Sequence, residues 1–326
     1  MLARLFHAPS LAPLLAGLLA PMLMVCLAAC APAFGADAPS PPNRFAATIV
    51  PAERFEVGAT LVERHGQGGK NLILIPGLAS GAWAWQSAVR RFAAEHSVYV
   101  LTFPGFDGRP AVSGAGMAAA QQSVLELISS RKLARPVLVG HALGGTMAIA
   151  LAAQHGTLIG GVVSLDGLPV MPGTEEWNPA QRGGMTGSIT GQVHSPTPSM
   201  FAAQQQQYMR GTGVIDMARA DELARLSARS DSQAVTRYMA EAISLDLRDA
   251  LPAISAPVLV ISPYFQLDAE QLRMTEEAKS AYYRALMQGT PNVKVVSVAP
   301  ARHFAMFDQP EQVNTAIADF LNSLRQ

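Results

Sequence analysis

Two short stretches of the sequence place residues where chemistry could occur. In the first, the mostly apolar residues 162–165 predict a buried strand, and Asp166 follows directly. Open α/β sheets bind their ligands beyond the carboxyl ends of their strands, where an unpaired buried carboxylate would be costly. In the second, residues 136–139 predict a strand and residues 144–153 a closely packed helix, with a sharp turn around Ala142 between them. Alanine has no oxygen, so this turn offers no nucleophile.

The turn Gly140-His141-Ala142-Leu143-Gly144 resembles the nucleophile elbow of the α/β-hydrolase family, Gly-x-Ser-x-Gly, which presents a serine above the sheet. Ala142 occupies the position of that serine. Residues 76–85 are similar to the oxyanion loop of the family, and residues 301–310 are similar to its catalytic-histidine loop. These segments follow the chain order of the family, and the resemblance covers residues 55–326.

The resemblance implies roles for several residues around this turn. The backbone N–H groups of Leu78 and Leu143 would point at a developing oxyanion. Pro76 stands where the family commonly has histidine, and a plain glycine turn leading into a helix is the alternative for this loop. His303 would be the base of a hydrolytic triad, whereas His141 is interpreted as a packing and turn residue without chemistry.

The acid that would hold His303 is open between Asp166 and Asp268. Most family members take this acid from the loop after the strand equivalent to residues 257–262, and here that loop brings Asp268 two or three residues late. Asp268 could equally cap the helix that follows. A minority of the family takes the acid from the end of the strand after the elbow, which is Asp166. The cost of an unpaired carboxylate at that strand end favours Asp166 as the partner.

Ala142 leaves three explanations: a serine deliberately changed to alanine, a natural protein without the activity, or an enzyme that needs only a dyad of His303 and an aspartate. Loss of a serine nucleophile costs on the order of a million-fold in kcat, whereas binding can survive. We therefore predict an α/β hydrolase of esterase or lipase ancestry, inactive as written, with a small, largely apolar, ester-like substrate or ligand. The alternatives are a small-ligand-binding protein and cofactor-free dyad chemistry. No cofactor or metal is expected.

The remaining sequence alternates strand and helix patterns, as in a mostly parallel, twisted sheet flanked by helices. Residues 55–63 and 71–75 are predicted to be antiparallel strands joined by a hairpin-like loop. Between about 170 and 250 the strand signal disappears, which resembles the helical cap that many family members insert after the sixth strand. Strands at residues 257–262 and 293–298, with a helix over residues 270–287 between them, complete a hydrolase domain predicted at residues 46–326.

The first 30 residues differ from the rest of the chain. The apolar run over residues 11–29 contains no acidic residue and predicts a secretory signal. Leu27-Ala28-Ala29-Cys30 resembles a bacterial lipobox, which would make Cys30 the lipidated first residue of the mature protein. Ordinary cleavage before Ala36 and an uncleaved membrane anchor are the alternatives. All three predict export, to the periplasmic face of a bacterial membrane or in soluble form, with residues 31–45 as a flexible tether.

Charge and cysteine content restrict the expected partners. The 24 Lys and Arg residues balance 24 Asp and Glu residues, so no net charge favours nucleic acid or an anionic membrane surface. The only cysteines are Cys26 and Cys30, which leaves the body of the chain without a pair for a disulfide. We expect no nucleic-acid partner, and membrane contact only through an N-terminal lipid anchor.

Overall fold

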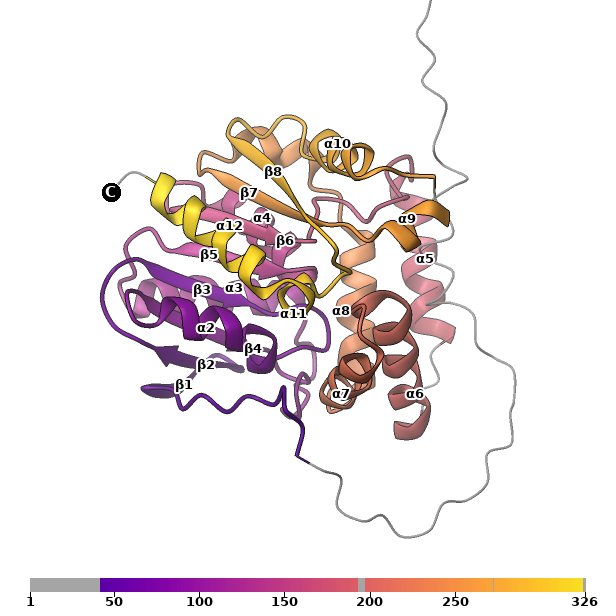
Figure 1. The fold of residues 1–326 in the computed structure, drawn as a ribbon, viewed down its shortest axis with the longest axis horizontal. Coiled ribbons are helices and arrows are strands. Elements are labelled where there is room, and N and C mark those ends of the chain that lie inside the picture. Colours follow the sequence, from indigo (N-terminus) through magenta and orange to yellow (C-terminus); the bar gives the residue numbers. More distant parts are fainter. Residues whose placement is uncertain (1–41, 193–196, 272, 325–326) are drawn as a thin grey trace, which may run out of the picture.

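The computed structural model of the protein describes residues 42–192, 197–271 and 273–324. The predicted signal sequence, Cys30 and most of the predicted tether lie outside these residues. Eight strands form one sheet in the order β1-β2-β4-β3-β5-β6-β7-β8 (Figure 1). The strands are β1 (Glu53–Val57), β2 (Thr60–His65), β3 (Asn71–Ile75), β4 (Ser97–Thr102), β5 (Val137–His141), β6 (Gly161–Leu165), β7 (Val258–Pro263) and β8 (Val293–Val298).

Helices cover both faces of this sheet. Only the pairs β1–β2 and β2–β4 are antiparallel, so the predicted fold class, a mostly parallel sheet flanked by helices, is confirmed. The helices are η1 (Ala82–Trp85), α2 (Gln86–Phe92), α3 (Met117–Ser130), α4 (Leu143–Gln154), α5 (Pro179–Gln192), α6 (Pro198–Tyr208), η2 (Met209–Gly213), α7 (Met217–Ser227), α8 (Ser232–Ser244), η3 (Arg248–Ala253), α9 (Gln266–Gln271), α10 (Glu276–Leu286), α11 (Ala305–Asp308) and α12 (Pro310–Ser323).

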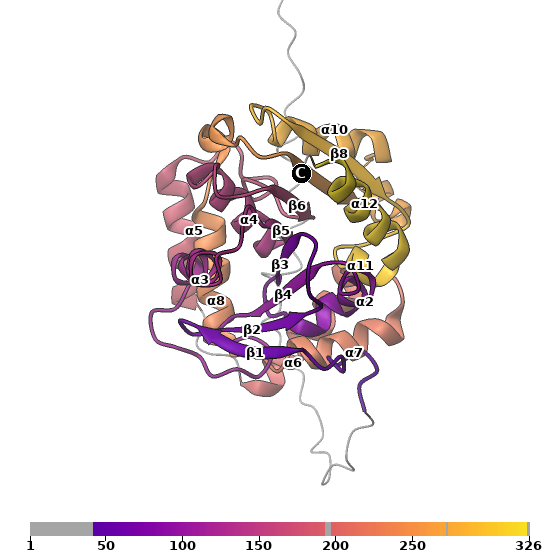
Figure 2. The ribbon, with the colours of Figure 1, turned by 90° about the vertical axis from the view of Figure 1, so that its left-hand side faces the viewer.

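The central strands contribute to two apolar layers, because successive side chains of a strand point to opposite faces. Figure 2 shows the sheet between α3 and α4 on one side and α2 and α12 on the other. One layer includes Ile73, Leu138, Val162 and Val260, and the other includes Leu72, Val137, Val163 and Leu259. Burial on both faces explains why these strands appear in the sequence as continuous apolar runs.

The N-terminal strands differ from the prediction. Residues 55–63 do not form one strand, because Gly58 adopts a φ of 55° and turns the chain back on itself between β1 and β2. The β3 strand was expected to pair with this segment in an antiparallel hairpin. It instead lies between β4 and β5 and is parallel to both. The antiparallel hairpin is therefore formed by β1 and β2, and not by residues 55–63 and β3 as predicted.

Helices α5 to α8 lie in the chain between β6 and β7, within the segment predicted to be a cap. In Figure 1 they stand together beside the ends of the strands. Buried Arg182 of α5 holds the base of this group, since it donates hydrogen bonds to the Thr174 carbonyl (2.7 Å) and to the Asp246 carboxylate (3.1 Å). We refer to the described helices of this segment, α5, α6, η2, α7 and α8, as the cap.

Residues 43–45, at the end of the predicted tether, contact other parts of the described chain. Asn43 donates a side-chain hydrogen bond to the Glu222 carbonyl (2.6 Å), and Arg44 forms an ion pair with the Glu222 carboxylate (2.7 Å). Phe45 packs edge-on against Phe307, with ring centroids 5.5 Å apart. Residues 43–45, the end of the predicted tether, are therefore attached to the cap and the histidine loop.

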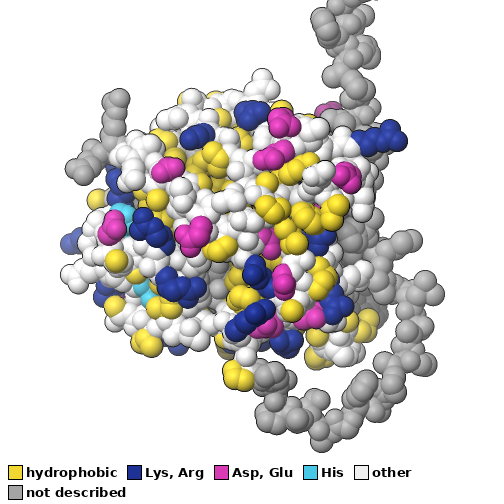
Figure 3. Space-filling model, viewed as in Figure 1, with side chains coloured by type: hydrophobic (Ala, Val, Ile, Leu, Met, Phe, Trp, Pro, Cys, Tyr) yellow, Lys and Arg dark blue, Asp and Glu magenta, His cyan; other side chains and the backbone are white. Residues whose placement is uncertain are grey.

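The surface carries charges of both signs. Figure 3 shows Lys and Arg side chains interspersed with Asp and Glu over one face of the molecule, in agreement with the balanced composition. Within the described ranges, no helix has both the length and the apolar character needed to cross a membrane.

Candidate active site

The turn between β5 and α4 has the backbone of a nucleophile elbow. Ala142 adopts φ 48° and ψ −115°, and its N–H donates a hydrogen bond to the Leu165 carbonyl at the end of β6 (2.8 Å). A positive φ is uncommon for a residue with a Cβ atom and costs about 1–3 kcal/mol unless the surroundings impose it. The protein therefore retains the strained turn although alanine supplies no hydroxyl group there.

Two glycines allow the close packing that this turn requires. A Cβ atom on Gly140 would clash with the carbonyl of Gly144, and a Cβ atom on Gly144 would clash with the carbonyls of Ile75 and Pro76. The absence of these side chains lets α4 approach both β5 and the loop after β3. The elbow and the predicted oxyanion loop consequently lie against each other.

The predicted oxyanion donors are backbone N–H groups of these two adjoining segments. Within the part of the chain that the structure describes, neither the Leu78 N–H nor the Leu143 N–H has a hydrogen-bond acceptor. Leu143 is the first residue of α4, where unpaired N–H groups and the helix dipole favour negative charge. Both groups are thus available to an oxygen of a bound ligand.

The structure brings Asp166 and His303 together. The Nδ1 atom of His303 lies 2.6 Å from Oδ2 of Asp166, and the two side chains are 19% and 12% exposed. The other carboxylate oxygen of Asp166 accepts a hydrogen bond from the Tyr283 hydroxyl at 2.5 Å. Because a carboxylate accepts, Nδ1 of His303 donates, and Nε2 is left with a lone pair that can take a proton.

The Asp166 carboxylate is stabilised in its charged form. Burial by itself works to raise the pKa of Asp166, but the hydrogen bond and charge of His303 act against it. The nearby charge of Lys279 and the Tyr283 hydroxyl act in the same direction, so the net pKa of Asp166 lies below its ordinary value. Asp166 is therefore ionised near neutral pH despite its burial.

Asp268 makes different contacts. Its two carboxylate oxygens accept hydrogen bonds from Arg302 at 2.6 and 2.7 Å, and its side chain is 42% exposed. The prediction that Asp268 caps the following helix is wrong, because it lies inside α9 and Thr275 caps α10. The predicted helix over residues 270–287 is divided near Arg273, which has a φ of 50°. The alternative acid thus binds the residue beside His303 and not the imidazole ring.

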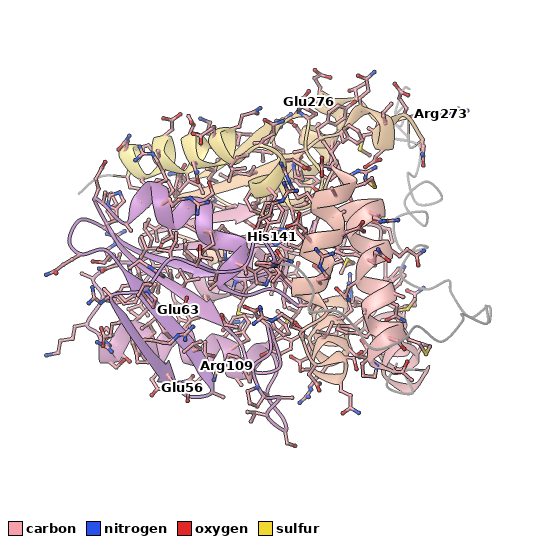
Figure 4. All side chains as sticks on the ribbon, turned by 60° about the horizontal axis from the view of Figure 1, so that its bottom comes forward. Glu56, Glu63, Arg109, His141, Arg273 and Glu276 are labelled. Atoms are coloured by element: carbon pink, nitrogen blue, oxygen red, sulfur yellow. The ribbon has the colours of Figure 1, made fainter. Side chains whose placement is uncertain are left out.

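His141 contributes more than the packing role predicted for it. Its Nε2 donates a hydrogen bond to the backbone carbonyl of His303 at 3.0 Å, and the two ring centroids are 4.6 Å apart. Burial is the main cause that lowers the pKa of His141 to about 3, so the ring stays neutral. Figure 4 shows His141 near the centre of the molecule, between the sheet and the cap helices. His141 therefore fixes the histidine loop to the elbow.

The cap also holds the histidine loop. The backbone N–H groups of His303 and Phe304 donate to the carbonyls of Thr212 (3.2 Å) and Gly213 (2.9 Å) in η2. The ring of Tyr208 lies edge-on to the ring of His303, with centroids 6.1 Å apart. These contacts join residues about 90 positions apart, and nothing in the local sequence pattern indicates them.

Comparison with known proteins identifies the family. A family profile described as "Alpha/beta hydrolase family" matches residues 72–316, which is most of the chain. The chain belongs to the α/β hydrolase family.

Relatives that are similar in sequence and solved structures that share the fold include esterases and an enol-lactonase. The bifunctional biotin biosynthesis protein BioHC of Cellvibrio japonicus is 27% identical over 260 residues, which cover 78% of this chain but only 48% of that relative. A pimeloyl-[acyl-carrier protein] methyl ester esterase of Aeromonas hydrophila is 24% identical over 80% of this chain and 98% of its own length. Two solved structures share the fold. A thermophilic esterase from Thermogutta terrifontis has a TM-score of 0.67 and 19% identity, with 84% of this chain and 100% of that chain covered. The enol-lactonase from Burkholderia xenovorans LB400 has a TM-score of 0.64 and 20% identity, with 83% of this chain and 100% of that chain covered.

This α/β hydrolase thus places a histidine bonded to a buried carboxylate and two free backbone N–H groups at one edge of its sheet. The combination suits reactions in which a proton is removed while negative charge develops on a carbonyl oxygen. Among the described residues, no group of three or more His, Cys, Asp and Glu side chains is placed to hold a metal ion.

Proposed function

We propose that this chain is an esterase-type α/β hydrolase whose site binds small, largely apolar carboxylic esters and forms no acyl-enzyme, because alanine occupies position 142. The hydrogen bond between His303 and Asp166 (2.6 Å), beside an elbow that keeps its strained backbone, carries this proposal. The names of relatives and structural neighbours, which include esterases and an enol-lactonase, support an ester as the ligand class.

The site has a group for each step of ester hydrolysis except the nucleophile that would form the first covalent bond to the substrate. With a serine at position 142, its Oγ would attack the ester carbonyl carbon while Nε2 of His303 accepts the hydroxyl proton. The carbonyl oxygen would become an oxyanion facing the N–H groups of Leu78 and Leu143. As the C–O bond breaks, His303 would give this proton to the leaving alkoxide. A water molecule, activated by His303 in the same way, would then attack the acyl-enzyme and release the acid. With alanine, the ester can bind but no covalent bond forms.

The first experiment compares the chain with its Ala142→Ser variant on a panel of p-nitrophenyl esters. We expect the hydroxyl to raise kcat by a factor that approaches the order of a million. Ala142→Gly is the matched control, because glycine accepts the positive φ but supplies no oxygen. Ester hydrolysis by Ala142→Gly as fast as by Ala142→Ser, or a folded Ala142→Ser variant without activity, would contradict the proposal.

A second candidate function needs only the dyad. The His303–Asp166 bond forms without a hydroxyl at position 142, so His303 can act as a general base on a substrate with an acidic C–H or O–H group. This function predicts turnover of such a substrate by the chain as written, unaffected by a serine-directed phosphonate. His303→Gln is the informative variant, since it must abolish that turnover.

We further propose that Cys30 anchors the mature protein to a bacterial membrane from the periplasmic side, because Leu27-Ala28-Ala29-Cys30 resembles a lipobox. Expression with labelled palmitate tests this proposal. The intact chain should be labelled, and Cys30→Ser should appear unlabelled in the soluble periplasmic fraction. Label retained by Cys30→Ser would overturn it.

A further inference from the structure

Helix α10 directs three neighbouring side chains toward the edge of the sheet that carries the dyad. Tyr283 donates its hydroxyl proton to Oδ1 of Asp166 (2.5 Å), and the adjacent Tyr282 donates to the carboxylate of Glu175. Lys279, one helical turn earlier, donates to the Pro263 carbonyl at the end of β7. Only one of these three bonds reaches the dyad directly, and none belongs to the motifs that identify the family.

The Tyr283 bond completes the contacts of the Asp166 carboxylate. One oxygen accepts from His303 and the other accepts from Tyr283, so two donors on different elements hold the carboxylate. A carboxylate with a single donor can rotate about its last bond, whereas one held at both oxygens has a fixed plane. Tyr283 itself is buried, with 5% of its surface exposed, so its hydroxyl has little freedom to move.

The surroundings of Tyr283 keep it a donor. Burial and the charge of Asp166 raise the pKa of Tyr283 well above its ordinary value, so the phenol stays protonated. Lys279 lies with its amine 5.5 Å from the centre of the Tyr283 ring, and its positive charge acts on Asp166. The same helix thus supplies a neutral donor and a charge to a buried carboxylate, which offsets the cost of burying it.

We propose that Tyr283 is a positioning residue of the active site, which holds the Asp166 carboxylate in the plane that keeps the proton of His303 on Nδ1. This role deepens the proposed function and rests on it for its catalytic consequence. Tyr283 does not contact the reacting atoms and acts only through Asp166. Its neighbour Tyr282 is a natural control, because it makes the same kind of bond from the same helix to a carboxylate outside the dyad.

The first test uses the chain as written and does not depend on activity. The Nδ1 proton of His303 is followed by NMR in the starting chain, in Tyr283→Phe and in Tyr282→Phe, with circular dichroism as the check of folding. We expect Tyr283→Phe to move this resonance upfield and broaden it, because a carboxylate free to rotate holds the proton less tightly. Tyr282→Phe should leave it in place. An unchanged resonance in Tyr283→Phe, or equal changes in both variants, would overturn the proposal.

A second measurement covers the case in which Tyr283→Phe fails to fold. Incorporation of 3-fluorotyrosine at position 283 keeps the ring and the hydroxyl but makes the hydroxyl a stronger donor. The Nδ1 resonance of His303 should then shift, and 3-fluorotyrosine at position 282 should not shift it. The absence of a shift at position 283 would count against the role of Tyr283.

The catalytic consequence is tested in the Ala142→Ser background. There, Tyr283→Phe should lower kcat by roughly 10- to 100-fold with little change in KM, since a displaced base slows the chemical step and not binding. Tyr282→Phe should stay within a few-fold of its parent. If Ala142→Ser has no activity, the proposed function fails while the NMR result still decides the role of Tyr283. If Ala142→Ser is active and both tyrosine variants match it, the positioning role fails alone.

Discussion

Asp166 follows β6 and Asp268 lies in α9 after β7, and both contact the histidine loop, but the two carboxylates have different surroundings. Asp166 is 12% exposed and binds the His303 ring, whereas Asp268 is 42% exposed and binds the guanidinium of Arg302. The first contact sets the proton position on a ring that can act as a base. The second fixes the backbone beside that ring, because Arg302 also donates to the carbonyls of Arg210 and Val214 in and beside η2. Proximity to a histidine loop is therefore a poor guide to which aspartate is the acid.

The largest expected effect separates these two aspartates kinetically. In the Ala142→Ser background, Asp166→Asn should lower kcat by up to about 10⁴-fold, because an amide facing Nδ1 favours the wrong tautomer of His303. Asp268→Asn should leave kcat within a few-fold of its parent. Steady-state kinetics on one p-nitrophenyl ester decides between them. The reverse ranking would assign the acid to Asp268, as in the majority of the family.

A third carboxylate, that of Asp107, extends the comparison of Asp166 with Asp268, because it is buried but has no ion pair as short as theirs. Asp107, in the loop after β4, is 11% exposed and lies 3.4 Å from Arg229 of the cap. Burial is the main cause that raises its pKa to about 6 from an ordinary 3.8. The folded protein therefore binds this proton more tightly than the unfolded chain does. The resulting cost in stability is present above about pH 6 and disappears as the pH falls toward 4.

Asp107→Asn should consequently stabilise the protein at high pH only. We expect the free energy of unfolding to rise by about 1–3 kcal/mol at pH 8 and to change little at pH 4. Denaturant unfolding at both pH values measures this difference. A destabilisation at pH 8 would show that the Arg229 pair contributes more than burial costs.

The smallest expected effect concerns the stability supplied by Asp268. Because its carboxylate is partly exposed, Asp268→Asn should cost less than about 1 kcal/mol of unfolding free energy. Arg302→Gln should cost more, about 1–2 kcal/mol, because it also removes the bonds to two cap carbonyls. A double-mutant cycle should show coupling between the two positions. Fully additive effects would mean that the Asp268–Arg302 pair does not act as a unit.

Local pattern was sufficient to predict much of the fold and the outline of the site. The strand predicted at residues 257–262, which the structure has as β7, was predictable because burial on both faces produces a nearly continuous apolar run. The elbow at Ala142 was predictable because its turn demands glycines. The N-terminal hairpin could not be predicted from the local pattern, because a single glycine, Gly58, makes the turn between β1 and β2. The chain order of the family motifs was sufficient to locate His303, but it did not decide whether Asp166 or Asp268 is the acid that holds it.

The supporting contacts of the site could not be predicted, because they join distant segments. Tyr283 and Asp166 are 117 residues apart, and His141 and His303 are 162 residues apart. Such pairs depend on how α10 and the histidine loop pack on the finished sheet. Neither residue type nor spacing distinguishes Tyr283 from its neighbour Tyr282, which binds Glu175.

The central claim is that the site lacks only a nucleophile, and covalent labelling tests it most directly. The chain as written and its Ala142→Ser variant are incubated with a fluorophosphonate, and their intact masses are measured. The account predicts a single adduct on Ala142→Ser, formed more slowly when Asp166→Asn is added, and no adduct on the chain as written. A folded Ala142→Ser variant that gains no mass would contradict it.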